Sequence, residues 1–127
     1  MLRVVCILLT LVATPLALAS DISGFWKHAE EPGWIEIQLD TGKGIVVRND
    51  KFPERVGREI LKDLRADGSQ EGLWLGQIYA EKLGEYKDAE ITLVEPGLME
   101  ITVRAGFISR TVEWVRTDEY PQLEKNQ

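Results

Sequence analysis

Apolar and polar residues alternate along most of this chain, and residues that favour turns interrupt the alternation at short intervals. A period of two places successive side chains on opposite faces of a β-strand. Beyond residue 20, no segment keeps a convincing 3.6-residue period over three turns. The pattern therefore predicts an all-β domain made of short strands and tight turns.

The alternation divides into eight segments of strand length. Their predicted ranges are 24–29, 34–39, 45–49, 59–65, 73–81, 89–95, 98–105 and 108–117. Consecutive strands with short links are typical of an antiparallel meander, and a meander of eight can close into an up-and-down barrel that has no exposed edges. We therefore expect a closed eight-stranded antiparallel barrel, with an open sandwich as the structural alternative. We expect side chains to fill most of a barrel this narrow.

The first residues differ in composition from the rest. Met1 and Arg3 precede an uncharged run over 4–18, and the segment ends in Ala17-Leu18-Ala19. A basic start, a short apolar run and a small-residue site are typical of a secretory signal peptide, cleaved after Ala19. A membrane-anchoring helix is the alternative, but the run is about fifteen residues and a span needs roughly 20. The predicted organisation is a signal peptide over 1–19, a barrel domain over 20–117 and a polar tail over 118–127.

Export would remove the only cysteine, Cys6, with the signal peptide. The remaining domain would have no disulfide and no thiol nucleophile, so its stability would depend on its core. Loss of Arg3 changes the formal net charge from −6 to −7. An acidic domain in the periplasm, or secreted, is a poor candidate for binding nucleic acid or an anionic membrane surface. We expect no membrane span after cleavage.

Residues that suggest catalysis are few. His28 is the only histidine, and without cysteine it does not make a metal site. The sequence has no glycine-rich phosphate loop and no H-E-x-x-H or S-x-x-K motif. We expect no cofactor and no metal. A hydrolase or isomerase that uses His28 or a pair of carboxylates is the least favoured alternative.

Alternate links of an up-and-down barrel lie at opposite ends. One end would receive compact polar turns, and the other would receive links with aromatic and charged residues, which are typical of a recognition surface. The alternative is that the aromatic residues plug this end. The candidate ligand-binding residues at this end are Arg110, His28, Tyr79, Tyr86, Phe52, Arg55 and Phe107.

Arg110 shares a strand face with Val112 and Trp114. An inward guanidinium cannot lose its proton, so it needs an internal partner or an anionic ligand. A ligand that carries a carboxylate or a phosphate would suit it. The candidate internal partners are Glu36, Asp63, Tyr79 and Tyr86.

Two short motifs lie on the first and the last predicted strands. Gly24 and Trp26 belong to the first strand, and Trp114 and Arg116 belong to the last. Together they resemble the closing signature of lipocalin-like, or calycin, barrels. Over 24–116 the chain also resembles a bacterial exported family known as domain of unknown function 2147. The matching segments are GFWKH, VGREILKDL, LWLGQIY, LGEYKDAEITLVEP and SRTVEWVR.

The chain departs from that family at Ala80-Glu81, where an Asp-Pro pair is more frequent. The resemblance implies a small lipocalin-like barrel and no particular activity. Closure of such a barrel brings the end of the last strand to the start of the first. We therefore expect the Arg116 guanidinium to stack on Trp26 and to donate to nearby carbonyls at the tight-turn end.

These observations favour a non-enzymatic exported barrel that binds a small anionic or amphipathic molecule near its rim. The alternative is a module that uses the rim loops to contact or inhibit another envelope protein.

The cleavage site gives the first testable prediction. Intact-mass and N-terminal analysis of the protein from its own cells should give a chain that begins at Ser20, or within one or two residues of it. Full-length protein that begins at Met1 and sediments with membranes would contradict the signal-peptide assignment.

Overall fold

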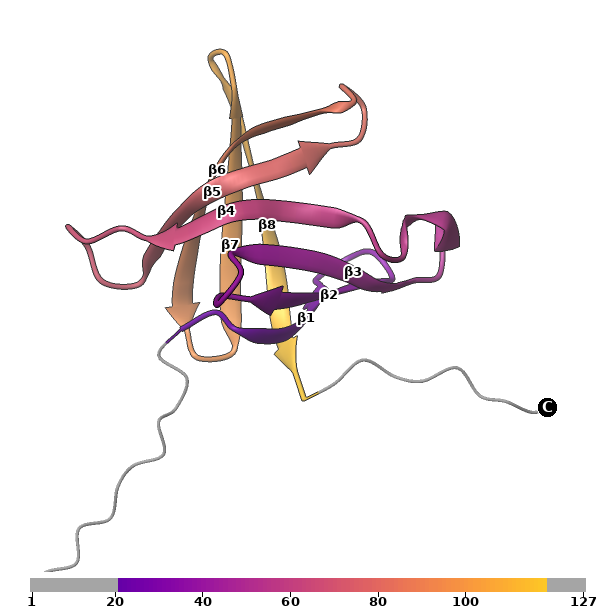
Figure 1. Cartoon of the computed structure of the whole chain (residues 1–127), viewed down its shortest axis with the longest axis horizontal. Helices are drawn as coiled ribbons and strands as arrows, with labels where there is room; N and C mark the ends of the chain where they lie inside the picture. Colours follow the sequence, from indigo (N-terminus) through magenta and orange to yellow (C-terminus); the bar gives the residue numbers. More distant parts are fainter. Residues whose placement is uncertain (1–20, 119–127) are drawn as a thin grey trace, which may run out of the picture.

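The computed structural model describes residues 21–118, which form one closed barrel of eight antiparallel strands in sequence order (Figure 1). The strands are β1 Gly24–His28, β2 Gly33–Gln38, β3 Lys43–Asn49, β4 Glu59–Ala66, β5 Leu73–Ala80, β6 Glu85–Glu95, β7 Leu98–Ala105 and β8 Ile108–Thr117. The prediction of an up-and-down barrel is confirmed, and the open-sandwich alternative is wrong. The predicted signal peptide and the predicted tail beyond Asp118 lie outside the described residues.

The largest difference from the predicted strands is at the start of β6. This strand begins at Glu85, four residues before the predicted start, because residues 85–88 pair with 77–80 of β5. Their polar composition suggests a loop, but Tyr86 lies opposite Tyr79 and the two rings make an edge contact. The link before β4 contains a short 3-10 helix, η1 (Pro53–Arg55), which begins with a proline.

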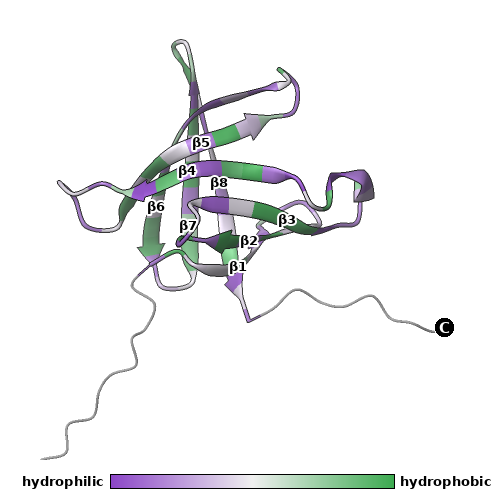
Figure 2. Ribbon diagram, viewed as in Figure 1, coloured by the Kyte–Doolittle hydropathy of each residue, from purple (hydrophilic) through white to green (hydrophobic). Residues whose placement is uncertain are grey.

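Buried apolar side chains form one core cluster inside the barrel. Figure 2 shows hydrophobic and hydrophilic residues alternating along the strands. No charged or polar residue is buried among residues 21–118. Burial contributes about 1.5–3 kcal/mol for each large apolar side chain. Leu93 and Val103 are partly buried against this core, and it includes the following buried residues: Trp26, Ile91, Met99, Ile101 and Trp114.

A β-bulge in β4 shapes one side of this core. Asp63 has a φ of 55°, and the register with β5 shifts between Lys62 and Arg65. The bulge directs Leu64 against Gly76, where a Cβ atom would lie 2.7 Å from Leu64 Cδ2 and 2.9 Å from the Lys62 carbonyl oxygen. Glycine at position 76 is therefore needed for this packing.

Arg116 joins the last strand to the residues before β1 and to the β6–β7 turn, at the end of the barrel that has the compact polar turns. Its guanidinium carbon lies 4.4 Å from the centre of the Trp26 ring, so the stacking expected from the sequence is confirmed. Its nitrogens donate to the carbonyl oxygens of Pro96 at 2.7 Å, Ser23 at 2.8 Å and Asp21 at 2.8 Å. Burial lowers the pKa of Arg116 and the Asp21 carboxylate opposes that shift, but a guanidinium keeps its proton in proteins.

The residues just before β1 close this end of the barrel. Ile22 is fully buried, and its carbonyl accepts a hydrogen bond of 2.9 Å from Trp26 Nε1. Gly24 has a φ of +114°, and a Cβ atom there would lie 3.3 Å from Nη1 of Arg116. Glycine at this position therefore allows the close approach of the guanidinium.

We predict that Arg116→Lys lowers the free energy of unfolding by about 2 kcal/mol, because an ammonium group cannot both stack on an indole and donate to three carbonyls. Urea denaturation of the chain without its predicted signal peptide measures this change. Arg104→Lys is the matched control, since Arg104 makes an exposed ion pair with Glu90 and such pairs contribute about 0.2–1 kcal/mol. Equal losses in the two variants would show that Arg116 does not fasten the barrel.

Candidate recognition site at the barrel rim

The links at the end opposite Arg116 spread apart (Figure 1). We call this end the rim; it comprises residues 29–32, 50–58 and 81–84 and the turn at 106–107. In Figure 1 the β7–β8 hairpin rises above the other strands, while the β5–β6 turn and η1 project to one side. The most exposed large apolar residues among 21–118 include four at or beside these links: Val56, Leu83, Phe107 and Ile108.

The structure divides the seven candidate ligand-binding residues among three places. His28 and Arg110 line one pocket. Phe107 is 99% exposed at the tip of the β7–β8 hairpin, so it does not plug the barrel. The other four candidates lie outside the barrel on or beside β4, β5 and β6: Phe52, Arg55, Tyr79 and Tyr86.

Cations and aromatic rings alternate in this outer group. The guanidinium of Arg55 lies 3.9 Å from the ring centre of Phe52, and that of Arg58 lies 5.1 Å from the ring centre of Tyr79. Both arginines form ion pairs with Glu81, and the hydrogen bond that Arg58 donates to Glu81 raises the pKa of Arg58. The contacts therefore tie the link before β4 to the β5–β6 turn.

Tyr79 and Tyr86 add further contacts between β4, β5 and β6 on the outer face. Their ring centres are 5.3 Å apart, and the Tyr86 hydroxyl donates to the Glu59 carbonyl oxygen at 2.7 Å. Lys62 Nζ lies 4.0 Å from the Tyr86 ring centre. Burial raises the pKa of Tyr86, and Glu59 and Tyr79 act in the same direction. The prediction that tyrosines accompany Arg110 inside the barrel is therefore wrong, because both rings are held on the outer face.

Arg110 lies on the inward strand face, as predicted, because it pairs with Val103. Its guanidinium is nevertheless exposed, since the β7–β8 hairpin extends beyond the barrel body. No carboxylate is buried among residues 21–118, so the expected internal partner is absent. Glu36 lies on an outward position of β2 and Asp63 is exposed at the bulge. Of the two alternatives that the sequence left open for Arg110, the internal partner is therefore wrong.

The His28 side chain accepts hydrogen bonds from the backbone of the β1–β2 link. Its Nδ1 accepts hydrogen bonds from the backbone N–H groups of Glu30 and Glu31, both at 3.0 Å, and its ring lies 4.9 Å from that of Trp114. Burial lowers the pKa of His28; Glu31 and Glu30 oppose the shift, and Lys27 and Arg110 add to it. An imidazole that accepts at Nδ1 carries its proton on Nε2. His28 therefore supports the link and is not arranged as a general base.

The β7–β8 hairpin has a free edge beside His28. The hairpin pairs continuously from Leu98 with Val115 to Ala105 with Ile108, whereas β1 pairs only with residues 114–117 of β8. Within the described part of the chain, residues 108–112 of β8 therefore have no neighbouring strand on the β1 side. Sequence reasoning missed this edge, although the predicted first and last strands already differ in length.

A pocket of about 310 Å³ lies along this free edge. The β1–β2 link forms one wall and residues 110–113 of β8 form the other. Its charged lining consists of one arginine, Arg110, and four glutamates. The glutamates are Glu30, Glu31, Glu100 and Glu113. The pocket is therefore acidic.

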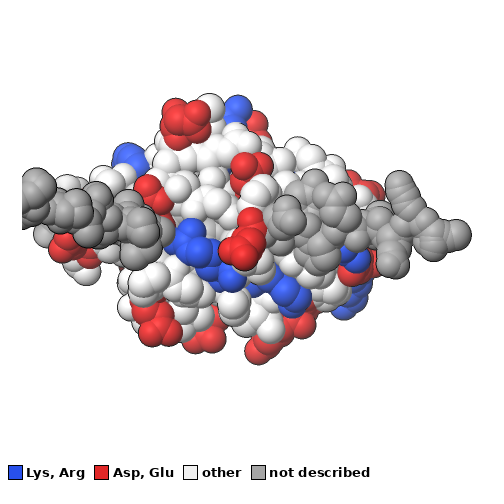
Figure 3. Space-filling model, turned by 90° about the horizontal axis from the view of Figure 1, so that it is seen from below, with Lys and Arg blue, Asp and Glu red and all other residues white. Residues whose placement is uncertain are grey.

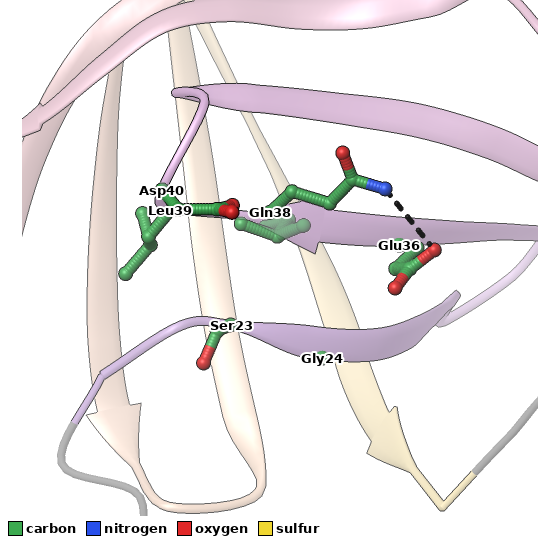
Figure 4. A pocket seen from close by; sticks show the side chains of 7 residues that line it. Ser23, Gly24, Glu36, Gln38, Leu39 and Asp40 are labelled. Carbon is green, nitrogen blue, oxygen red and sulfur yellow. Dashed lines mark hydrogen bonds between the residues drawn. The ribbon is translucent and has the colours of Figure 1, made fainter.

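A larger hollow, of about 670 Å³, lies at the closed end beside Ser23 and Gly24 (Figure 4). The end of β2 and the link after it supply the rest of the lining, where Gln38 Nε2 donates to Glu36 Oε1 at 3.4 Å. The hollow is wide open, and neither an aromatic ring nor a cation lines it. The hollow therefore lies at the opposite end from the ligand-binding residues expected from the sequence.

Two cations lie beside Trp34 on the outer side of β2, and one of them, Lys27, also donates to the Glu31 carbonyl oxygen of the link that lines the acidic pocket. Lys27 Nζ and the Arg48 guanidinium lie 5.4 Å and 5.0 Å from the ring centre of Trp34, which is buried on the outer side of β2. Figure 3, seen from the side of β1, shows lysine and arginine side chains in a band across the face. The molecule thus has a basic band and an acidic rim pocket.

Among residues 21–118, no three histidine, aspartate or glutamate side chains are grouped closely enough to hold a metal ion. No helix in this part of the chain is long and apolar enough to cross a membrane. The chain matches no family model, no curated protein and no solved structure. The resemblance to domain of unknown function 2147 therefore stays a prediction.

We predict that His28 makes the folding stability depend on pH. Burial holds its pKa in the folded state below the ordinary histidine value of about 6.5, so the folded protein binds the proton less readily than the unfolded chain. Stability should be highest above that value and fall as the pH drops towards the lowered pKa. Urea denaturation between about pH 5 and about pH 7.5 spans the relevant range.

His28→Asn is the control for this effect, because its Oδ1 can accept the same two backbone hydrogen bonds and cannot titrate. This variant should lose the pH dependence around the histidine pKa. His28→Ala should lose it too, and should also lower stability at neutral pH by about 1 kcal/mol through the two unbonded N–H groups. The same pH profile in His28→Asn and in the native protein would contradict the assignment.

Proposed function

We propose that this protein is an exported, non-enzymatic binding module that holds a protein partner at its rim. The observation that carries the proposal is that the interior and the rim of the barrel differ in how their apolar side chains are used. Packed apolar side chains occupy the interior, while the rim links carry exposed apolar side chains, of which Phe107 is 99% exposed. Exposed apolar residues on projecting loops are typical of interaction surfaces.

Export is part of this proposal and is supported by the sequence alone. The uncharged run before Ala19 and the absence of cysteine after Cys6 suit a protein that leaves the cytoplasm and folds without disulfides. The periplasm is the proposed compartment if the source has two membranes.

A small amphipathic molecule in the rim pocket is the second candidate ligand. The pocket volume of about 310 Å³ falls at the lower end of the range for small-molecule sites. An anionic ligand has less support, because four glutamates line the pocket and Arg110 is its only cation. A protein partner is favoured because the most exposed apolar side chain lies on the hairpin tip, outside the pocket lining.

Catalysis by His28 also has little support. Its Nδ1 already accepts two backbone hydrogen bonds, so it is not free to take a proton from a substrate. The facing glutamates of the pocket, Glu100 and Glu113, lie on the outer side of adjacent strands and do not converge on an enclosed cleft.

Site-specific photocrosslinking tests the proposal. Phe107 is replaced by benzoylphenylalanine in cells that make the protein, and Val94, which is 49% exposed near the closed end, is replaced in the same way as a control. We expect ultraviolet light to join one defined protein to position 107 and none to position 94. Absence of a protein adduct at position 107, or equal adducts at the two positions, would contradict a partner at the rim.

A further inference from the structure

The free edge of β8 presents unused backbone hydrogen-bonding groups. Ala29 N donates to the Glu113 carbonyl oxygen at 2.9 Å, so the backbone groups of Glu113 face the β1 side. Residues two apart in an antiparallel strand direct their N–H and C=O groups to the same side. Ser109 and Thr111 therefore direct theirs to the edge where, within residues 21–118, no strand pairs.

The side chains along this edge have different chemistry on the two strand faces. On the inner face Val112 is half-buried and Arg110 is exposed. On the outer face Thr111 is followed by Glu113, which pairs directly with Glu100 of β7. Like charges directly opposite each other destabilise a sheet, and a cation placed beside them relieves the repulsion. Glu30 and Glu31 face the same space from the β1–β2 link.

We propose that this edge binds an extended, lysine-rich segment of a partner protein, which adds to the sheet as a further strand beside β8. The inference rests on the proposed rim function and deepens it, because it names the mode of binding and the class of partner. Strand addition supplies affinity through backbone hydrogen bonds and specificity through alternate side chains. The four glutamates select a basic segment.

The alternation of the edge also sets the pattern of the bound segment. A residue beside Thr111 shares the outer face with Glu100 and Glu113, so lysine suits it. Residues beside Val112 share the inner face, so an apolar β-branched residue suits them. A second copy of this chain fits less well, because it would bring the glutamates of two acidic pockets together.

Titration with a synthetic peptide tests this mode of binding. The probe is a heptapeptide that alternates valine and lysine, added to the ¹⁵N-labelled chain without its predicted signal peptide. We expect the largest amide shifts at Ser109 and Thr111, slower hydrogen exchange at both amides, and weaker binding as salt increases. A peptide that alternates valine and glutamate, and a valine–lysine peptide with N-methylated backbone amides, should each bind at least about tenfold more weakly.

Two variants of the protein form a matched pair. Thr111→Val removes the hydroxyl that contacts Thr102 and keeps the backbone N–H, whereas Thr111→Pro removes both. Proline is tolerated where a strand N–H faces a free edge, so the melting temperatures of the two variants should be close. We expect Thr111→Pro alone to weaken binding of the valine–lysine peptide by about tenfold, the effect of one lost hydrogen bond.

The outcomes separate this inference from the proposed function. Equal binding of the N-methylated and unmodified peptides, or equal affinities in the two Thr111 variants, would overturn strand addition at β8. A dimeric mass in solution, with slow exchange of the Ser109 and Thr111 amides before any peptide is added, would also overturn it, because a second copy would cover the edge. Either result leaves a crosslinked partner at Phe107 intact, and loss of that crosslink is the separate failure of the rim function.

Discussion

The barrel depends on a short seam between its first and last strands. β1 pairs with β8 over only four residue pairs, and Arg116 fastens the end of that seam through Trp26 and three backbone carbonyls. A guanidinium suits this place because its flat face covers an indole while its donors reach carbonyls in several directions. The seam closes one end of the barrel with Ile22 inside it and leaves the upper half of β8 beyond the reach of β1.

This asymmetry directs the function that we propose. Apolar side chains fill the interior, which supports the stability of a domain with no cysteine among its described residues. The proposed recognition then takes place at the rim, where the β7–β8 hairpin carries Phe107, a free strand edge and one wall of the acidic pocket. The outer group of aromatic and charged residues has a structural role. Its members Arg58, Glu81 and Tyr86 join the neighbouring links to each other.

The sequence predicts features that follow from strand order and parity. Eight alternating segments predict the barrel, and antiparallel closure places Arg116 against Trp26 without any knowledge of side-chain packing. Burial at the rim could not be predicted in this way. Parity places Arg110 on the inner face correctly, but its exposure depends on how far the neighbouring strands extend. Tyr86 was similarly misplaced, because the polar residues around it conceal the start of β6.

Hydrogen exchange of single backbone amides in the free protein tests the central claim most directly, because the seam and the free edge lie on the same side of one strand. The N–H groups of Val115 and Thr117 face β1, and those of Ser109 and Thr111 face the open edge. The account predicts slow exchange at Val115 and Thr117 and fast exchange at Ser109 and Thr111. Similar protection at all four amides would contradict it, since the edge of β8 would then be covered along its whole length.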